Sequence, residues 1–390
     1  MAVVRLTPTA VAAQGFEVVQ VAPTDRRAVA TAARLERELL RATPFCPELD
    51  ADVRRRFTGR SAFMGATQQA IFVASAGGRP VGRARAAISA RWQDLHGEQH
   101  TGFIGDLAFA PGEPMAGRAL IAACEDWLAG RGVERVLGGM SHMFIQYVVR
   151  TSAFDELPAY PARWDPPALA AALESVGYER GAPAWTYTLD LAAPVWRAAA
   201  AEAAARARCD IRPLDKRRWA QDFDALCAVF NDAFADEFEF QPMRPAEWRE
   251  TWDPYRPIFD AENIQLAEVD GQVVGACVGG LDIAPLLQIL DGRLGPVRIA
   301  RFVRGRARLR QASIFLIGVR SGHRRRGIAA GLLGRLLSHY SAQQLDRVVY
   351  HLVNDENTAS RALAERFGGS GRALHHRFAR RLERDERGRV

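Results

Sequence analysis

Two segments of the chain share one pattern of apolar and polar positions. Residues 72–82 and residues 265–275 each alternate as a strand, a two-residue turn and a second strand. The turns at 77–78 and 270–271 read Gly-Gly and Asp-Gly, pairs that are typical of tight hairpins because both central residues take a positive φ. A shift of 193 residues superimposes the two patterns. The chain is therefore predicted to contain an internal repeat.

The same elements are predicted around each hairpin. In the first half they are a strand at 17–21, a helix at 25–40, a strand at 107–111, a helix from Gly117 through Trp127, and a strand at 133–137. In the second half they are a strand at 210–212, a helix at 215–234, a strand at 317–321, a helix from Gly327 through Leu337, and a strand at 347–353. Each half then ends in a short helix and a β segment. This order predicts the α/β class, with a mixed sheet in each half.

A helical connector is expected between the halves. Residues 192–208 are rich in alanine and contain no proline after Pro194, which favours a helix over a flexible linker. The expected domains are therefore 1–191 and 209–390. Each is large enough to bury a core of its own.

The composition excludes several classes of protein. The chain has 390 residues, 48% of them hydrophobic and 25% charged, which is typical of a globular protein rather than a disordered one. It has no run of 18 apolar residues, so we expect no membrane span, and its start does not resemble a secretion signal. Five cysteines without a CxxC pair argue against a disulfide framework or a zinc ribbon, and they favour a cytoplasmic protein. The net charge of +7 permits an anionic partner.

The segment 312–333 carries the clearest chemistry. An apolar strand ends at Val319, a loop with three arginines at 324–326 follows, and a helix is predicted to begin at about Gly327. A helix start offers free N–H groups and the positive end of the helix dipole, and a glycine lets a ligand come close to the backbone. Arginine adds bidentate donors for phosphate. The segment therefore predicts a binding site for a pyrophosphate.

This segment resembles the acyl-CoA loop of the Gcn5-related N-acetyltransferase (GNAT) family, which reads Arg/Gln-x-x-Gly-x-Gly/Ala after a strand ending in L-x-V. The matching loop residues are Arg324, Arg325, Arg326, Gly327, Ile328 and Ala329, and the matching strand residues are Ile317, Gly318 and Val319. A second family motif, V-x-x-x-N-x-x-A, matches from Val353, with Asn357 at the asparagine and Ser360 in place of the alanine. The resemblance implies that these residues bind acetyl-CoA or another acyl-CoA as a substrate, without a metal. Asn357 is also a good helix N-cap, which is a purely structural explanation for it.

The chain departs from the family pattern at three places. Ser321 stands where many members have proline, and Ala364 stands where the family commonly has a tyrosine that reprotonates the leaving thiolate. No general acid is therefore assigned. At a shift of 210, the arginines at 324–326 correspond to Pro114, Met115 and Ala116, so the first half is expected to be a degenerate GNAT-like domain without the phosphate donors.

The resemblance implies that the N–H of Val319 polarises the thioester carbonyl. An attacking amine also needs a base, and the strand at 314–319 carries no carboxylate. The candidates are His351 and Tyr350 on the next strand, Glu268 before the second hairpin turn, and Glu237 or Glu239. His351 has a suitable intrinsic pKa, but a histidine here can also be a core or strand-surface residue.

Two further regions each have two interpretations. Residues 230–260 hold eight carboxylates interleaved with aromatic side chains, which predicts either an acceptor site for a cationic amine or a helix pair with a solvated acidic face. The insertion at 282–310 holds seven arginines and leucines at helical spacing. It predicts a core or lid helix whose arginines are solvated, or a surface for RNA or a membrane.

The expected function is that of an acyl-CoA-dependent N-acyltransferase with its active site in the second half. Acetyl-CoA is the expected donor, and the acceptor is expected to be the amine of a small molecule that attacks the thioester directly. One alternative is a transferase that takes its acyl group from aminoacyl-tRNA, because tandem copies of this fold also serve peptidoglycan-bridge enzymes. Another alternative is a CoA-binding module without catalytic activity.

Overall fold

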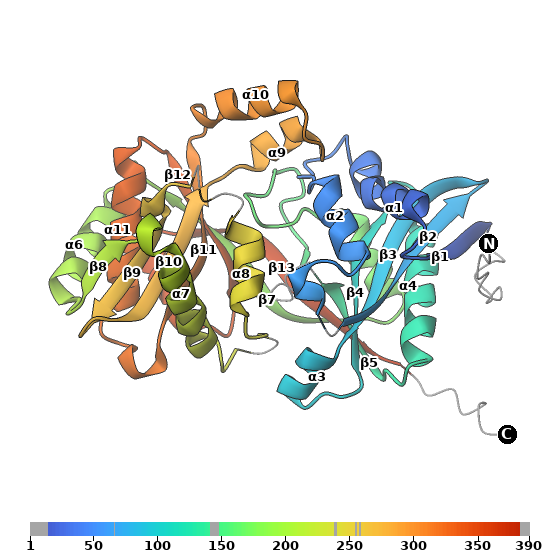
Figure 1. Ribbon diagram of the computed structural model, residues 1–390, viewed down its shortest axis with the longest axis horizontal. Coiled ribbons are helices and arrows are strands. Elements are labelled where there is room, and N and C mark those ends of the chain that lie inside the picture. The colour runs from blue at the N-terminus through green and yellow to red at the C-terminus, as the bar shows by residue number, and fades with distance from the viewer. Residues whose placement is uncertain are drawn as a thin grey trace.

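One continuous β-sheet runs through the protein, with helices on both of its faces (Figure 1). The computed structural model describes residues 15–65, 67–140, 148–237, 240–253, 256 and 259–382. The strand order is β1-β2-β3-β4-β5-β13-β7-β12-β11-β10-β9-β8, and β6 pairs with β13 beside this path. Among the described strands, β4–β5 and β11–β12 are the only parallel neighbours. The predicted mixed α/β class is confirmed.

The first half contains seven strands and five α-helices within the described ranges. The strands are β1 (Phe16–Val21), β2 (Thr67–Ala76), β3 (Arg79–Ser89), β4 (Thr101–Phe109), β5 (Arg135–Met140), β6 (Val149–Arg150) and β7 (Glu179–Asp190). The helices are α1 (Arg26–Leu39), α2 (Asp50–Phe57), α3 (Ala90–His96), α4 (Pro114–Ala129) and α5 (Pro167–Ser175). Alternate residues of β2 face opposite layers: Phe72 packs in the core that includes α4, and Ile71 packs in the core beneath α1.

The second half repeats this arrangement. Its strands are β8 (Asp210–Pro213), β9 (Ile264–Val269), β10 (Gln272–Leu281), β11 (Gln311–Val319), β12 (Arg347–Asn354) and β13 (Ser370–Arg381). Its helices are α6 (Val195–Arg206), α7 (Trp219–Ala233), α8 (Pro245–Trp252), α9 (Ala284–Leu290), α10 (Pro296–Arg306), α11 (Ile328–Ala342) and α12 (Thr358–Arg366). Helices α6, α11 and α12 share one core with the sheet, and α7 and α8 share another. Helix α6 lies within the segment expected to connect the halves.

The two predicted hairpins are confirmed as β2–β3 and β9–β10. Their turn residues have positive φ, with Gly78 at 78° and Gly271 at 74°. The repeat extends to the packing of helices on these strands. A methyl group added at Gly82 would lie 2.8 Å from Leu120 of α4, and one added at Gly275 would lie 2.9 Å from Ile328 of α11. Each glycine therefore allows the long helix of its own half to approach the sheet closely.

The halves exchange one strand each, which the repeat pattern does not predict. Strand β7 pairs with β12 of the second half, where Tyr187 lies opposite Tyr350. Strand β13, from the end of the chain, pairs with β5 of the first half, where Phe378 lies opposite Gly138. The two exchanged strands also pair with one another. As a result, a division of the chain at 192–208 separates the helical layers but not the sheet.

Candidate active site

Strands β11 and β12 diverge in the second half and leave a gap between them. Their pairing runs only from Gln311 opposite Arg347 to Ile314 opposite Tyr350, although both strands continue beyond these residues. In β12 the register against β7 shifts by one residue between Tyr350 and Val353. Leu352, in this shift, has φ of 49°. Such bulges re-aim side chains and end strand pairing beside active sites.

A pocket of about 170 Å³ lies at this gap, and both halves of the chain line it. Its lining residues are Val148, Pro161, Ala184, Phe234, Glu237, Phe240, Met243, Phe315, Leu316, Ile317, Tyr350, His351, Leu352, Val353, Asn354, Asn357, Ser360 and Arg377. The aromatic and aliphatic members make much of the wall apolar. Of the five catalytic candidates named from the sequence, the structure brings together three here, namely Glu237, Tyr350 and His351.

The main chain of β11 directs polar groups into the gap. The N–H of Arg320 donates to the Val274 carbonyl of β10 at 2.9 Å. N–H groups of successive strand residues point to alternate sides, and the register from Leu316 to Val319 is unbroken. The N–H groups of Ile317 and Val319 therefore point away from β10, toward the side that β12 has left.

The loop from β11 to α11 has the shape of an anion-binding turn. Arg325 and Gly327 have left-handed φ angles of 63° and 77°, on either side of Arg326. Such an alternation makes successive N–H groups converge on one concavity. Gly327 is the N-cap of α11, so the free N–H groups of the first helical turn lie next to this concavity.

The three loop arginines differ in their surroundings. Arg324 donates to the Ala233 carbonyl at 2.8 Å, which attaches the loop to the end of α7. Asp232, also at the end of α7, accepts from the Ser321 N–H at 2.6 Å and holds the same loop. Arg325 and Arg326 have exposed side chains. The sequence gave no reason to distinguish the three arginines, whereas in the structure Arg324 is fixed by its hydrogen bond to Ala233.

Glu237 is held in the pocket wall by two amides. Its Oε1 accepts from Asn357 Nδ2 at 2.8 Å, and its Oε2 lies 3.5 Å from Asn354 Nδ2. The Asn357 side-chain oxygen accepts from the Ser360 N–H at 3.0 Å and thus caps α12. One asparagine therefore starts this helix and orients the carboxylate. The sequence identified the cap but gave no signal for its contact with Glu237.

Tyr350 and His351 are both buried, with different consequences. The Tyr350 hydroxyl and the Ser360 hydroxyl are 2.6 Å apart, and burial raises the pKa of Tyr350, so that it keeps its proton at neutral pH. Burial lowers the pKa of His351 to about 4, with a smaller lowering from Arg150 and an opposing effect of the Tyr160 main chain. His351 is therefore neutral at pH 7.

Glu268 lies apart from the pocket. It accepts from Arg212 Nε at 3.0 Å, and Arg212 also forms a bidentate pair with Asp222. Glu268 therefore stabilises the edge of the sheet between β8 and β9. Phe238, Glu239 and Tyr255 lie outside the described residues.

The acidic region at 230–260 does not form one acidic surface. Glu247 pairs with Arg91 of the first half at 2.8 Å, and Glu250 accepts from the Ser61 hydroxyl at 2.8 Å. Other carboxylates of the region fix the fold locally, and Trp248 and Trp252 stack in the core. Among the described residues, Glu247 and Glu250 therefore join the two halves, and Glu237 is the one carboxylate of the region that lines the pocket, so the region does not form a single acidic acceptor patch.

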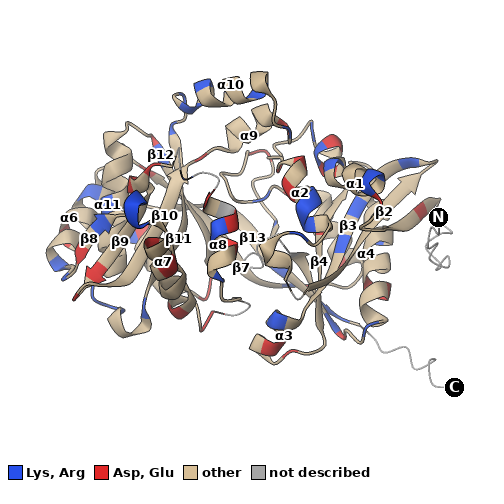
Figure 2. Cartoon of the chain, viewed as in Figure 1, with Lys and Arg blue, Asp and Glu red and all other residues tan. Residues whose placement is uncertain are grey.

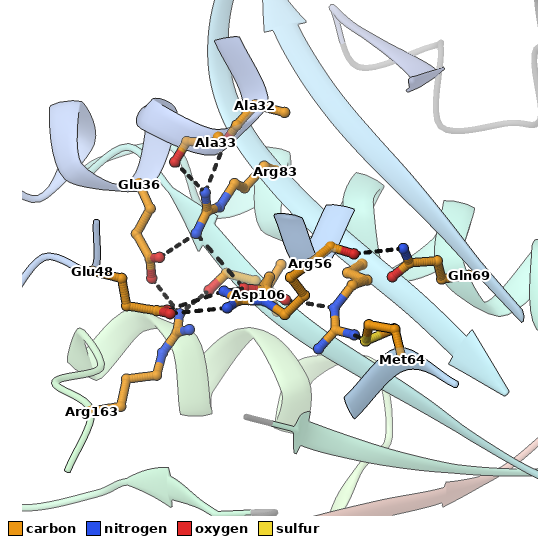
Figure 3. A network of polar contacts seen from close by, with 12 residues as sticks. Ala32, Ala33, Glu36, Glu48, Arg56, Met64, Gln69, Arg83, Asp106 and Arg163 are labelled. Atoms are coloured by element: carbon orange, nitrogen blue, oxygen red, sulfur yellow. Dashed lines mark hydrogen bonds and ion pairs between the residues drawn. The ribbon is translucent and has the colours of Figure 1, made fainter. Parts of the chain in front are cut away.

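In the first half, a buried ion-pair network occupies the corresponding place (Figure 3). Asp106 of β4 corresponds to the pocket residue Leu316 at the shift of 210 residues. Asp106 accepts from Arg56 at 2.7 Å and from Arg85 at 2.6 Å, and all three side chains are buried. The neighbouring Arg83 pairs with Glu36. Charged side chains thus fill the site that is open in the second half.

We expect the exposed loop arginines to strengthen CoA binding. Replacing Arg326 by alanine is predicted to weaken CoA binding about tenfold, because a charge-assisted hydrogen bond to phosphate contributes about 1.5–3 kcal/mol when fully formed, and less at an exposed site. Arg335→Ala, in the third turn of the same helix, is the control. Calorimetric titration with CoA measures both variants, and equal affinities would contradict a diphosphate site at this loop.

Within the described ranges, no three His, Cys, Asp or Glu side chains are close enough together to hold a metal ion. Across the same ranges, no helix has the length and apolar character needed to cross a membrane.

Comparisons with known proteins agree with this geometry. Residues 224–369 match the family described as "Acetyltransferase (GNAT) family". The chain is 26% identical over 312 residues to the "Bacterial ceramide synthase" of Caulobacter vibrioides (strain NA1000 / CB15N), covering 77% of this chain and 80% of that protein. It is also 26% identical over 311 residues to "Protein YghO" of Escherichia coli (strain K12), covering 76% of this chain and 78% of that one.

Among solved structures, a tandem GNAT protein from the clavulanic acid biosynthesis pathway matches with a TM-score of 0.56 and 16% identity, covering 94% of this chain and 98% of the other. The second half of the chain therefore belongs to the acetyltransferase (GNAT) family, and the whole chain has the tandem GNAT fold.

Proposed function

We propose that the protein transfers an acyl group from an acyl-CoA to a primary amine at the gap between β11 and β12. One observation carries the proposal. The gap, with the Val319 N–H directed into it, lies next to the anion-binding start of α11, so one extended thioester can reach both. The family implies an acyl-CoA substrate but leaves the acyl group and the acceptor open.

The donor is oriented at its two ends. The diphosphate of CoA accepts hydrogen bonds from the N–H groups at Arg326 to Ile328, aided by the exposed Arg325 and Arg326 side chains. The thioester carbonyl accepts from the Val319 N–H. That hydrogen bond strengthens as the carbonyl oxygen gains negative charge in the tetrahedral intermediate.

Glu237 receives the amine. An alkylammonium entering the pocket meets this carboxylate, which Asn357 holds in place. Glu237 takes a proton from the ammonium, and the free amine attacks the thioester carbon. His351, whose pKa burial lowers to about 4, is neutral at pH 7 and has no charge to attract an ammonium, so it acts as a neutral part of the wall.

Tyr350 and Ser360 provide the proton for the leaving group. When the C–S bond breaks, the CoA sulfur carries a negative charge and needs one proton. The hydroxyl pair at 2.6 Å lines the pocket, and Tyr350 is protonated at neutral pH, so a proton is present there although burial makes this hydroxyl a weaker acid. The nitrogen loses its second proton as the amide forms, and this proton restores the hydroxyl pair. The proton that Glu237 accepted is released to solvent, so the enzyme returns to its starting state. This pair would take the place of the tyrosine that Ala364 replaces.

We further propose that the acceptor amine carries an apolar portion. Among the described residues, the pocket wall includes Phe234, Phe240, Met243 and Phe315, and Glu237 is the one carboxylate that lines it. Such a lining suits an alkyl amine better than a polyamine. The relative named "Bacterial ceramide synthase" also supports an acceptor with a long apolar portion, because a ceramide is by definition an N-acylated long-chain amino alcohol. The proposed acceptor is still an ammonium, but it has a longer apolar portion than the small amine expected from the sequence.

The test is a matrix of donors and acceptors with release of free CoA as the readout. Donors run from acetyl-CoA to palmitoyl-CoA, and acceptors include long-chain amino alcohols, short alkyl amines and polyamines. We expect amine-dependent release that is greatest with the long-chain acceptors. CoA binding without release in every combination would favour a non-catalytic binding module, and release only with polyamines would overturn the proposed acceptor.

A further inference from the structure

The insertion between β10 and β11 carries an exposed surface that is both apolar and basic. Among the described residues, seven large hydrophobic side chains are exposed, and five of them lie between residues 289 and 303. Leu294, Val297 and Val303 are each more than 60% exposed. Helix α10 has no buried residue. Exposed apolar side chains gathered on one element mark an interaction surface rather than chance exposure.

The apolar side chains of α10 lie on one side of the helix. At 3.6 residues per turn, Ile299, Val303, Ala300 and Val297 follow one another around the helix within an arc of about 160°. Phe302 and Arg298, on the opposite side, are only partly exposed. The apolar arc of α10 therefore faces solvent and not the protein.

The same segment contains most of the net positive charge of the chain. Residues 284–310 hold seven arginines and one aspartate, a net charge of +6, while the whole chain has +7. Figure 2 shows arginines along α10 and no acidic residue on it. Arg304 falls within the apolar arc of α10, and Arg301 flanks it. Their long side chains can lie along apolar groups while the guanidinium reaches a polar layer.

The insertion belongs to the second half and is braced against the first half, so this surface has a fixed orientation. Asp291, at the end of α9, pairs with Arg41 at 3.2 Å, and Gln288 donates to the Phe45 carbonyl at 3.0 Å. At its base, Asp282 accepts from the Tyr160 N–H at 2.8 Å. The Tyr160 ring packs edge-on against Phe315 in the pocket wall. In Figure 1, α10 projects from the rest of the molecule at the top of the view.

We propose that α10 and Leu294 dock the protein on an anionic lipid bilayer. An amphipathic helix with arginines and exposed apolar side chains lies in the interface of such a bilayer and gains from burial of the apolar arc and from attraction to acidic lipids. RNA would use the arginines but would leave Val297, Ile299 and Val303 in water, so the combination favours lipid. The proposal does not depend on the transferase reaction.

The experiment measures flotation of the full chain, without substrates, on vesicles of phosphatidylcholine alone and on vesicles that also contain phosphatidylglycerol. We expect binding to the anionic vesicles that weakens as salt is added. Arg301→Gln with Arg304→Gln is expected to weaken this binding about thirtyfold. Val297→Asn with Val303→Asn is expected to weaken it about tenfold or more.

Matched controls lie elsewhere on the surface. Leu95→Asn removes a comparably exposed apolar side chain, and Arg26→Gln with Arg27→Gln removes two exposed charges of α1. Both are expected to bind vesicles as the unaltered chain does. The proposal is overturned if the unaltered chain does not float with anionic vesicles or if the valine variants float as well as the controls. It is also overturned if the valine variants instead convert a dimer into a monomer. Any of these results leaves the acyl-transfer proposal standing, because flotation requires no turnover.

Discussion

Replacing Glu237 by glutamine is expected to lower the turnover number at least about a hundredfold, because general-base catalysis contributes about 10²- to 10⁴-fold. Glutamine keeps the size of the side chain, and its oxygen can still accept from Asn357, so the pocket wall stays in place. The charge that attracts an ammonium and the site that takes its proton are both lost. Affinity for CoA should stay within about twofold, because Glu237 is not part of the phosphate loop.

The control for this prediction is Glu268→Gln. Its carboxylate pairs with Arg212, which retains its two bonds to Asp222 in the variant. We expect turnover close to that of the unaltered chain. The assignment of Glu237 is wrong if Glu237→Gln remains fully active, and equally wrong if His351→Gln alone abolishes turnover while binding CoA normally. Initial rates and CoA titrations of the three variants separate these outcomes.

Replacing Asp106 by asparagine is expected to destabilise the protein by about 3–5 kcal/mol, the usual effect of removing one partner from a buried ion pair. Arg85 would lose its carboxylate partner and remain as a buried charge, and Arg56 would keep only Glu48. Asparagine is chosen because Asp106 has φ of 48°, and asparagine tolerates this left-handed backbone better than alanine does. Urea unfolding measures the change.

The pH dependence of the stability follows from the direction in which the pKa of Asp106 is shifted. Arg56, Arg85 and Arg83 hold the pKa of this carboxyl well below its usual range, despite the opposing effect of burial. A group with a lowered folded-state pKa stabilises the fold above its unfolded pKa of about 3.9 and loses that contribution as the pH falls toward the folded value. The difference between the unaltered chain and Asp106→Asn should therefore be constant from pH 7 to pH 5 and shrink only in more acidic solution.

The control for Asp106 is Glu38→Gln, in an exposed pair with Arg34. Its removal should change stability by less than about 1 kcal/mol. If Asp106→Asn lowered the stability as little as this control does, the buried network would not be the structural core of the first half. The interpretation that this network stabilises the first half at the position that corresponds to the second-half pocket would then lose its support.

The elements and the repeat were predictable because they depend on local signals. The two hairpin turns need residues that accept positive φ. The dipeptides Gly77-Gly78 and Asp270-Gly271 meet this need, so they predict the turns directly. The exchange of β7 and β13 left no such signal. Each strand follows a short helix and has a similar pattern of apolar and polar residues, so either strand could pair within either half. Only pairing between residues far apart in the sequence determines which half each strand joins.

The phosphate loop of the site was predictable for the same reason, because Gly327 and the arginines before it lie in one short stretch of sequence. The pocket was less predictable. Ala184 and Arg377 reach it on the exchanged strands β7 and β13, Val148 and Pro161 come from the first half, and no motif marks any of the four. The ion pairs that use Glu247, Glu250 and Glu268 also join residues far apart in sequence. The sequence therefore could not show that Glu237 faces the pocket while Glu247, Glu250 and Glu268 pair elsewhere.

The central claim is that CoA binds with its diphosphate at the start of α11 and its sulfur between β11 and β12. A crystal structure of the protein with a non-hydrolysable acyl-CoA analogue tests it most directly. We predict one molecule per chain, with the diphosphate on the N–H groups that follow Arg325 and the acyl carbonyl within hydrogen-bonding distance of the Val319 N–H. An analogue bound at α4 of the first half, or one whose acyl group lies outside the gap, would contradict the account.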